Sequence, residues 1–202
     1  MRKGKAVALT AVPLLISMAI ILSALYLNHV QKFNSPKLIQ NGAYILILLN
    51  TLIFTKISRK SLREVGVFRH HLLRQIIVGL VIGVIFLTVA GIFVGWSGFS
   101  GEDFMYLAFS QVLVAFTEEL LFRGYILTVL EDATDKPDRA VFISALLFGL
   151  WHYPAAQNIM LVFIMVLTGM IYGTLRIVFE RTEDEIGILS LTTAHWIFNV
   201  FS

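Results

Sequence analysis

Residues 72–94 read LLRQIIVGLVIGVIFLTVAGIFV, an apolar run whose only charged or amide side chains, Arg74 and Gln75, stand near its start. A helix rises 1.5 Å per residue, so about 20 such residues cross the roughly 30 Å hydrocarbon core of a bilayer. Hydrophobic residues make up 57% of the 202-residue chain, and its mean hydropathy is +0.81. A chain of this length is too short to bury several such helices in the core of a soluble protein. The sequence therefore predicts an integral membrane protein.

Six further apolar segments accompany this run and predict an all-α, polytopic bundle of about seven transmembrane helices. The first segment follows a basic start and resembles a signal peptide, but it is longer than a usual signal core and ends in no clear cleavage site. We therefore expect it to remain as a helix. The seven segments are residues 6–27, 39–55, 72–94, 104–130, 140–152, 159–179 and 186–201.

The basic residues predict how these helices cross the membrane. With the N-terminus in the cytoplasm, thirteen of the 16 Lys and Arg residues fall in inner segments, and only Lys32 and Lys37 in outer loops. We therefore expect a multi-pass protein of the cell membrane with a cytoplasmic N-terminus. The thirteen are Arg2, Lys3, Lys5, Lys56, Arg59, Lys60, Arg63, Arg69, Arg74, Lys136, Arg139, Arg176 and Arg181.

The same distribution indicates what the protein binds. The net charge is +3, but the basic residues stand between apolar spans and form no single stripe, so they suit anionic lipid headgroups and not nucleic acid. The absence of cysteine excludes disulfides and thiolate metal sites. Small residues one helical turn apart predict close helix packing. These pairs are Gly79 with Gly83, Gly91 with Gly95, and Gly169 with Gly173.

Three ionisable residues stand inside the fourth segment, where each costs roughly 2.5–3.5 kcal/mol to insert. Glu119 and Arg123 are four residues apart and share a helix face, which predicts a supporting ion pair. Glu118 is rotated by about 100° and has no such local partner. An unpaired carboxyl group in this setting is suited to taking up and releasing protons.

Three further polar side chains stand in later segments. His152 ends the motif Phe148-Gly149-Leu150-Trp151-His152, and His195 and Asn199 lie four residues apart on one helix face. Measured from the inner helix ends, Glu118, His152, His195 and Asn199 lie roughly 19, 18–20, 15 and 21 Å deep. Groups brought by three helices to one depth near the bilayer midplane predict a joint site.

The residues of this site suit the activation of water. No serine or cysteine stands at helical spacing from a histidine, and neither Ser110 nor Thr117 meets that condition. Glu118, helped by His152, would take a proton from water, while His195 and Asn199 would stabilise an oxyanion. Alternatively, His152, His195 and Glu118 would hold Zn²⁺, which lowers the pKa of bound water.

The motifs Glu118-Glu119-x-x-x-Arg123, Phe148-x-x-x-His152 and His195-x-x-x-Asn199 occur in this order on the fourth, fifth and seventh apolar segments. Together they resemble the three motifs of the CAAX-protease and bacteriocin-processing (CPBP, or Abi) family. The resemblance implies an intramembrane endopeptidase of a family classed with metalloproteases, with residues 101–202 as its catalytic core. Residues 1–100 would add N-terminal helices to the same membrane domain.

Carried over by motif, the resemblance gives catalytic roles to Glu118, His152, His195 and Asn199. Glu119, Arg123 and Phe148 would support them. The substrate would be a membrane-associated protein or peptide, such as a CAAX protein or a bacteriocin. Two other classes stay open. One is a non-catalytic membrane interaction or immunity protein with this fold, and the other is a transporter or proton relay, which the lack of matching motifs in the first half disfavours.

Overall fold

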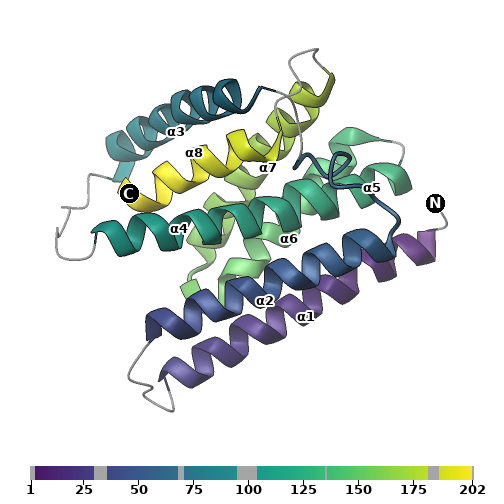
Figure 1. Cartoon of the computed structure of the whole chain (residues 1–202), viewed down its shortest axis with the longest axis horizontal. Coiled ribbons are helices and arrows are strands. Elements are labelled where there is room, and N and C mark those ends of the chain that lie inside the picture. The colour runs from purple at the N-terminus through teal and green to yellow at the C-terminus, as the bar shows by residue number, and fades with distance from the viewer. Residues whose placement is uncertain are drawn as a thin grey trace.

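The computed structural model describes residues 3–29, 36–67, 71–94, 104–134, 136–181 and 187–201, and every regular element within them is helical. The predicted all-α bundle is confirmed, and each of the seven apolar segments forms a helix (Figure 1). The bounds are α1 Lys3–His29, α2 Pro36–Ile57, α3 Leu72–Val94, α4 Phe104–Glu119, η2 Leu120–Ile126, α5 Leu127–Thr134, α6 Pro137–Ala156, α7 Ile159–Arg181 and α8 Ile188–Phe201.

Four of the described helices are long and apolar enough to cross a membrane. They are Gly4–His29, Pro36–Ile57, Leu72–Val89 and Ile159–Phe179, and a shorter apolar helix covers Ile188–Phe201. Many large apolar side chains of α3 are exposed, and Ile77, Val84 and Ile85 are 50–56% exposed. Lipid is the solvent that suits such a surface, so the protein is an integral membrane protein.

The helices associate in pairs around the fourth segment. α1 lies beside α2, α6 beside α7 and α3 beside α8, while α4 packs on both α2 and α8 (Figure 1). The helices of residues 1–100 are therefore built onto those of the second half. This arrangement places α4 and η2 in the middle of the bundle, where their polar side chains are shielded.

Glycines permit two of these close pairings, as predicted. A Cβ added to Gly79 would lie 2.4 Å from the carbonyl oxygen of Ser190, so only glycine lets α3 approach α8 this closely. On α7, a Cβ at Gly169 would lie 2.9 Å from the Cα of Ala145 in α6. Gly95, which was predicted to pair with Gly91, lies outside the described residues.

The fourth segment differs from the predicted continuous α-helix, because it contains a π-helical stretch, η2. In it the N–H of Leu127 donates to the carbonyl oxygen of Phe122, which also accepts a hydrogen bond of 2.9 Å from the hydroxyl of Ser144 in α6. π-helical turns inside α-helices occur frequently at functional sites. All seven residues of η2 are buried, so the altered turn lies in the protein interior.

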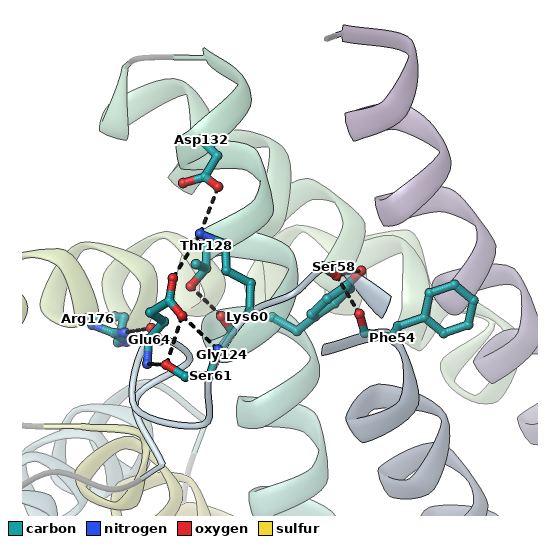
Figure 2. A network of polar contacts seen from close by, with 10 residues as sticks. Phe54, Ser58, Lys60, Ser61, Glu64, Gly124, Thr128, Asp132 and Arg176 are labelled. Atoms are coloured by element: carbon teal, nitrogen blue, oxygen red, sulfur yellow. Dashed lines mark hydrogen bonds and ion pairs between the residues drawn. The ribbon is translucent and has the colours of Figure 1, made fainter. Parts of the chain in front are cut away.

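One end of the bundle is closed by a polar network between the loop after α2 and the helices α5 and α7 (Figure 2). Lys60 forms ion pairs of 2.8 Å with Asp132 and 3.3 Å with Glu64. Arg176 was counted above with the inner charges, but its side chain is buried and donates to the carbonyl oxygen of Glu64 at 3.1 Å. It therefore binds the loop and does not face lipid headgroups.

The charges of this network stabilise each other. Hydrogen bonds from the backbone N–H and the hydroxyl of Ser61 hold the pKa of Glu64 below its ordinary value. Partial burial opposes the charge of Lys60, yet the hydrogen bonds and ion pairs with Asp132 and Glu64 outweigh it and raise the pKa of Lys60. The loop is thus fastened to the bundle by ionised groups.

Candidate active site

The carboxylate of Glu118 lies in the middle of the bundle, with only 4% of the residue exposed. Its Oε1 accepts a hydrogen bond of 2.7 Å from the hydroxyl of Tyr44 in α2. Its Oε2 lies 3.6 Å from Nε2 of His152 and 3.8 Å from Nε2 of His195. The structure thus brings Glu118 and the two histidines together, and the contacts of this carboxylate come from α2, α6 and α8.

His152 is oriented by its own helix. Its Nδ1 lies 2.8 Å from the carbonyl oxygen of Phe148, one turn earlier in α6. A carbonyl oxygen only accepts hydrogen bonds, so Nδ1 carries the proton and Nε2 is the atom turned toward Glu118. The ring also packs edge-to-face on the ring of Phe148, at 4.5 Å between centroids. Phe148 thus holds the imidazole from two sides, in the supporting position predicted for it.

His195 is oriented by the second carboxylate. Its Nδ1 lies 2.8 Å from Oε1 of Glu119, and the same oxygen accepts a hydrogen bond of 3.2 Å from Nη1 of Arg123. The predicted pair of Glu119 and Arg123 is therefore present and almost free of solvent contact, at 0% and 1% side-chain exposure. The guanidinium group also lies 3.9 Å above the ring of Phe148. A carboxylate that binds Nδ1 leaves Nε2 of His195 to face Glu118.

Asn199 lies one turn beyond His195 in α8. Its Nδ2 donates a hydrogen bond of 3.0 Å to Oε1 of Gln111 in α4. This contact fixes the direction of the amide group. It also adds Gln111, which the sequence analysis did not name, to the residues around the site.

All four predicted catalytic residues line one cavity of about 570 Å³. Its remaining wall is largely apolar and includes Ile21, Phe86 and Met165. Pockets of this size, with a few polar groups that point inward, are typical of binding sites for small molecules and short segments. The structure thus brings together every residue of the predicted site.

Two residues at the site were missed, and the sequence offered a signal for one of them. Gln111 precedes Glu118 by seven residues, two helical turns, so it lies on the same face of α4. Tyr44 lies 74 residues before Glu118 on another helix, and only the packing of α2 on α4 brings them together. Ser110 donates a hydrogen bond of 2.7 Å to Oδ1 of Asn41, and the hydroxyl of Thr117 is buried without a hydrogen-bond partner among the described residues.

The metal prediction concerns His152, His195 and Glu118. The described part of the chain contains no group of three His, Cys, Asp or Glu side chains placed to hold a metal ion. The roles proposed for these residues therefore do not depend on a metal. Zinc binding stays a prediction, to be tested directly.

Comparison with known proteins agrees with this geometry. A search among curated proteins and one among solved structures returned no match. The family model described as type II CAAX prenyl endopeptidase Rce1-like matches residues 100–201, half of the chain. This range contains all three motifs and every predicted site residue. The chain therefore belongs to the Rce1-like family of type II CAAX prenyl endopeptidases.

Proposed function

We propose that this protein hydrolyses peptide bonds of membrane-associated proteins or peptides with a water molecule activated by Glu118 and His152. The observation that carries the proposal is the meeting of a buried carboxylate with two imidazoles at the wall of a cavity. Membership of a protease family supports the reaction type. The carboxylate and imidazoles supply the acid–base groups that such a reaction needs.

In the first step, a water in the cavity gives a proton to Oε2 of Glu118 while its oxygen attacks the carbonyl carbon of the peptide bond. Nε2 of His152 lies 3.6 Å from Oε2 of Glu118, so a water molecule between these two atoms would contact both and the proton would be shared through it. The carbonyl oxygen becomes an oxyanion. When the intermediate collapses, the C–N bond breaks and the shared proton passes to the leaving amine.

The oxyanion would be stabilised by His195 and Asn199. Nδ1 of His195 donates to Glu119. When the ring is doubly protonated, Nε2 also carries a proton and donates it to the oxyanion in a hydrogen bond, and Glu119 then faces the positive charge of the ring. The amide of Asn199 adds a second donor, held in direction by Gln111. Removing one such donor in other hydrolases costs about 10²–10³ in rate. Arg123 holds Glu119 in place through their ion pair.

The membrane orientation belongs to the same proposal. The basic residues favour a cytoplasmic N-terminus and the cell membrane, with anionic lipids against the inner loops. Partners would be the lipid bilayer and the membrane-associated substrate. Prenylated CAAX proteins and bacteriocin-like peptides are the two substrate kinds that the family resemblance suggests.

The test compares purified wild type with Glu118→Gln and His152→Ala in detergent, on a prenylated CAAX peptide and on an unprenylated membrane peptide. Both variants should lose about 10²–10⁴ in kcat. Glu131→Gln changes a carboxyl group in α5, which does not line the cavity, and serves as the matched control. Full cleavage by both site variants would refute the mechanism.

A chelator arm addresses the metal. Wild type that keeps its activity after chelator treatment uses glutamate chemistry alone, whereas loss of activity that Zn²⁺ restores shows a metalloprotease. Metal content of the purified protein, measured by mass spectrometry, gives a readout that does not depend on activity. A biological effect that survives Glu118→Gln would instead indicate the non-catalytic interaction or immunity protein.

A further inference from the structure

The wall that α7 forms at the catalytic cavity contains no residue of the three motifs. Three of its residues line the cavity, and their spacing of three and four positions places them on one helix face. These residues are Met165, Thr168 and Tyr172. The side chain of Met165 has no hydrogen-bond donor, and the hydroxyl of Thr168 already donates to the carbonyl oxygen of Ile164 at 3.0 Å. Among these three, Tyr172 is therefore the residue that can offer a donor to a bound molecule.

The side chain of Tyr172 is buried but its hydroxyl is unpaired. Only 2% of the residue is exposed, and the hydroxyl forms no hydrogen bond with any residue that the structure describes. A buried tyrosine hydroxyl usually has a partner, as Tyr125 in η2 does, whose hydroxyl donates to the carbonyl oxygen of Leu9 at 2.9 Å. Because Tyr172 lines the cavity, a molecule in the cavity is the partner that its hydroxyl can reach.

Packing holds the ring of Tyr172 in one orientation. Phe86 of α3 contacts it edge-to-face at 5.2 Å between centroids, and the guanidinium carbon of Arg123 lies 5.6 Å from its centroid. A side chain on a helix leans toward the N-terminal end of that helix, so Tyr172 leans back toward Thr168, which also lines the cavity. The hydroxyl at the tip of the ring is therefore carried toward the cavity.

The ring of Tyr172 also lies beside His195, which the proposed function gives a part in stabilising the oxyanion. The two ring centroids are 6.3 Å apart, and the ring planes meet at 70°. This separation is short enough for one oxygen atom in the cavity to accept hydrogen bonds from Nε2 of His195 and from the hydroxyl of Tyr172. Asn199 reaches the same cavity from one turn farther along α8. The donors would thus surround the oxygen from two helices.

We propose that Tyr172 is a further catalytic residue, whose hydroxyl donates a hydrogen bond to the oxyanion formed on the carbonyl group of the peptide bond. The inference rests on the proposed function and adds a third donor to His195 and Asn199. A tyrosine hydroxyl is neutral and donates one hydrogen, so it keeps its proton and no group is transferred. A donor fixed before the reaction stabilises the developing negative charge more than the neutral carbonyl, so its effect appears in kcat and not in KM.

The first experiment replaces Tyr172 by Phe, which removes the hydroxyl and keeps the ring that packs on Phe86. The kcat for cleavage of a membrane peptide should fall about 10²-fold, with KM unchanged. The free energy of unfolding should stay the same or rise, because the hydroxyl has no partner within the described part of the protein. An unchanged kcat, or a raised KM with an unchanged kcat, would overturn the proposal.

Tyr125→Phe is the matched control, because it removes a tyrosine hydroxyl that is hydrogen-bonded and does not line the cavity. This variant should lose stability and keep its kcat, which is the opposite of the pattern expected for Tyr172→Phe. If both variants lose kcat and stability together, the effect at Tyr172 comes from the fold. That result would also overturn the proposal.

The second experiment measures binding and does not require cleavage. Its probe is a membrane peptide in which a phosphonamidate replaces the amide group that would be cut. This group is stable, anionic and tetrahedral, like the intermediate, and analogues of this kind bind more tightly than substrates when a site stabilises the developing charge. Tyr172→Phe should weaken the binding of this peptide about 10²-fold, and Tyr125→Phe should leave it unchanged.

The two experiments together separate a failure of this inference from a failure of the proposed function. If wild type cleaves the peptide, but neither kcat nor phosphonamidate binding depends on Tyr172, the inference alone is wrong. If wild type cleaves no peptide but binds the phosphonamidate through Tyr172, the anion site is supported and the proposed function is refuted. If wild type neither cleaves nor binds, both are refuted.

Discussion

The hydroxyl of Tyr44 donates a hydrogen bond of 2.7 Å to Oε1 of Glu118, across 74 residues of sequence. The two oxygens of this carboxylate thus have different surroundings, because Oε1 is held by α2 and Oε2 faces the histidines of α6 and α8. A hydrogen bond of this kind fixes the rotation of the carboxylate plane. The contact at Oε1 of Glu118 is therefore made by a residue that precedes the part of the chain that the family model matches.

Replacing Tyr44 by Phe should lower kcat about 10- to 100-fold with little change in KM, because hydrogen bonds to charged groups contribute about 1.5–3 kcal/mol. Steady-state cleavage of a membrane peptide measures both constants. Tyr106→Phe is the matched control, since its hydroxyl also binds α2, at the carbonyl oxygen of Lys37, but lies away from the cavity. Equal kcat in the two variants would show that Tyr44 does not act through Glu118.

Replacing Arg123 by Met should destabilise the protein by about 3–5 kcal/mol, because Glu119 would keep a buried charge without its cation. The free energy of unfolding in mixed micelles is the measurement. Adding Glu119→Gln to Arg123→Met should restore part of the loss, since the double variant buries no lone carboxylate. If the single variant unfolds like wild type, the pair is not a structural element.

Replacing Gly79 by Ala should lower the stability by about 1–3 kcal/mol, because the added methyl group would meet the backbone carbonyl of Ser190. Gly42→Ala in α2 is the control, since nothing lies within 4 Å of its added Cβ. There the same change should be neutral or should stabilise the helix by up to about 1 kcal/mol. A similar melting temperature for both variants would argue against close packing of α3 on α8.

Replacing Glu64 by Gln should lower the melting temperature at neutral pH. The corresponding loss in the free energy of unfolding should be about 1 kcal/mol or less, because the side chain of Glu64 is half exposed. The folded state lowers the pKa of Glu64 below 4.5, so the ionised carboxylate stabilises the fold above that pH. This contribution is lost as the pH falls through the lowered pKa. The melting temperatures of wild type and variant should therefore converge as the pH is lowered through this range, and a gap that does not depend on pH would contradict the assignment.

Much of the fold followed from local sequence. Hydropathy predicts helices because the backbone must satisfy its own hydrogen bonds in lipid, and the four-residue spacing of Glu119 and Arg123 predicts their contact within one helix. The common depth of Glu118, His152 and His195 was sufficient to predict their meeting, since helices in a bilayer share one frame of reference. These predictions depend on distances along a single helix.

The rest depended on how helices pack on each other. The contact of Tyr44 with Glu118 requires the rotation of α2 against α4, which no periodicity within either segment specifies. The π-helical stretch was missed because its residues are as apolar as an α-helix would require. It is accompanied by contacts from outside the helix, such as the hydroxyl of Ser144 and the loop at Val65, whose carbonyl oxygen would lie 2.9 Å from a Cβ on Gly124.

The π-helical stretch from Leu120 to Ile126 makes the length of this segment as important as its composition. Removing one residue from it would let the backbone close as an ordinary α-helix without a gap. Because a π-helical turn holds about one residue more than an α-helical turn, the side chains that follow would then keep nearly their present direction relative to Glu118. A deletion within this stretch is therefore compatible with the direction of the helix that follows, whereas an insertion there would turn the residues from Leu127 to Thr134 by about 100°.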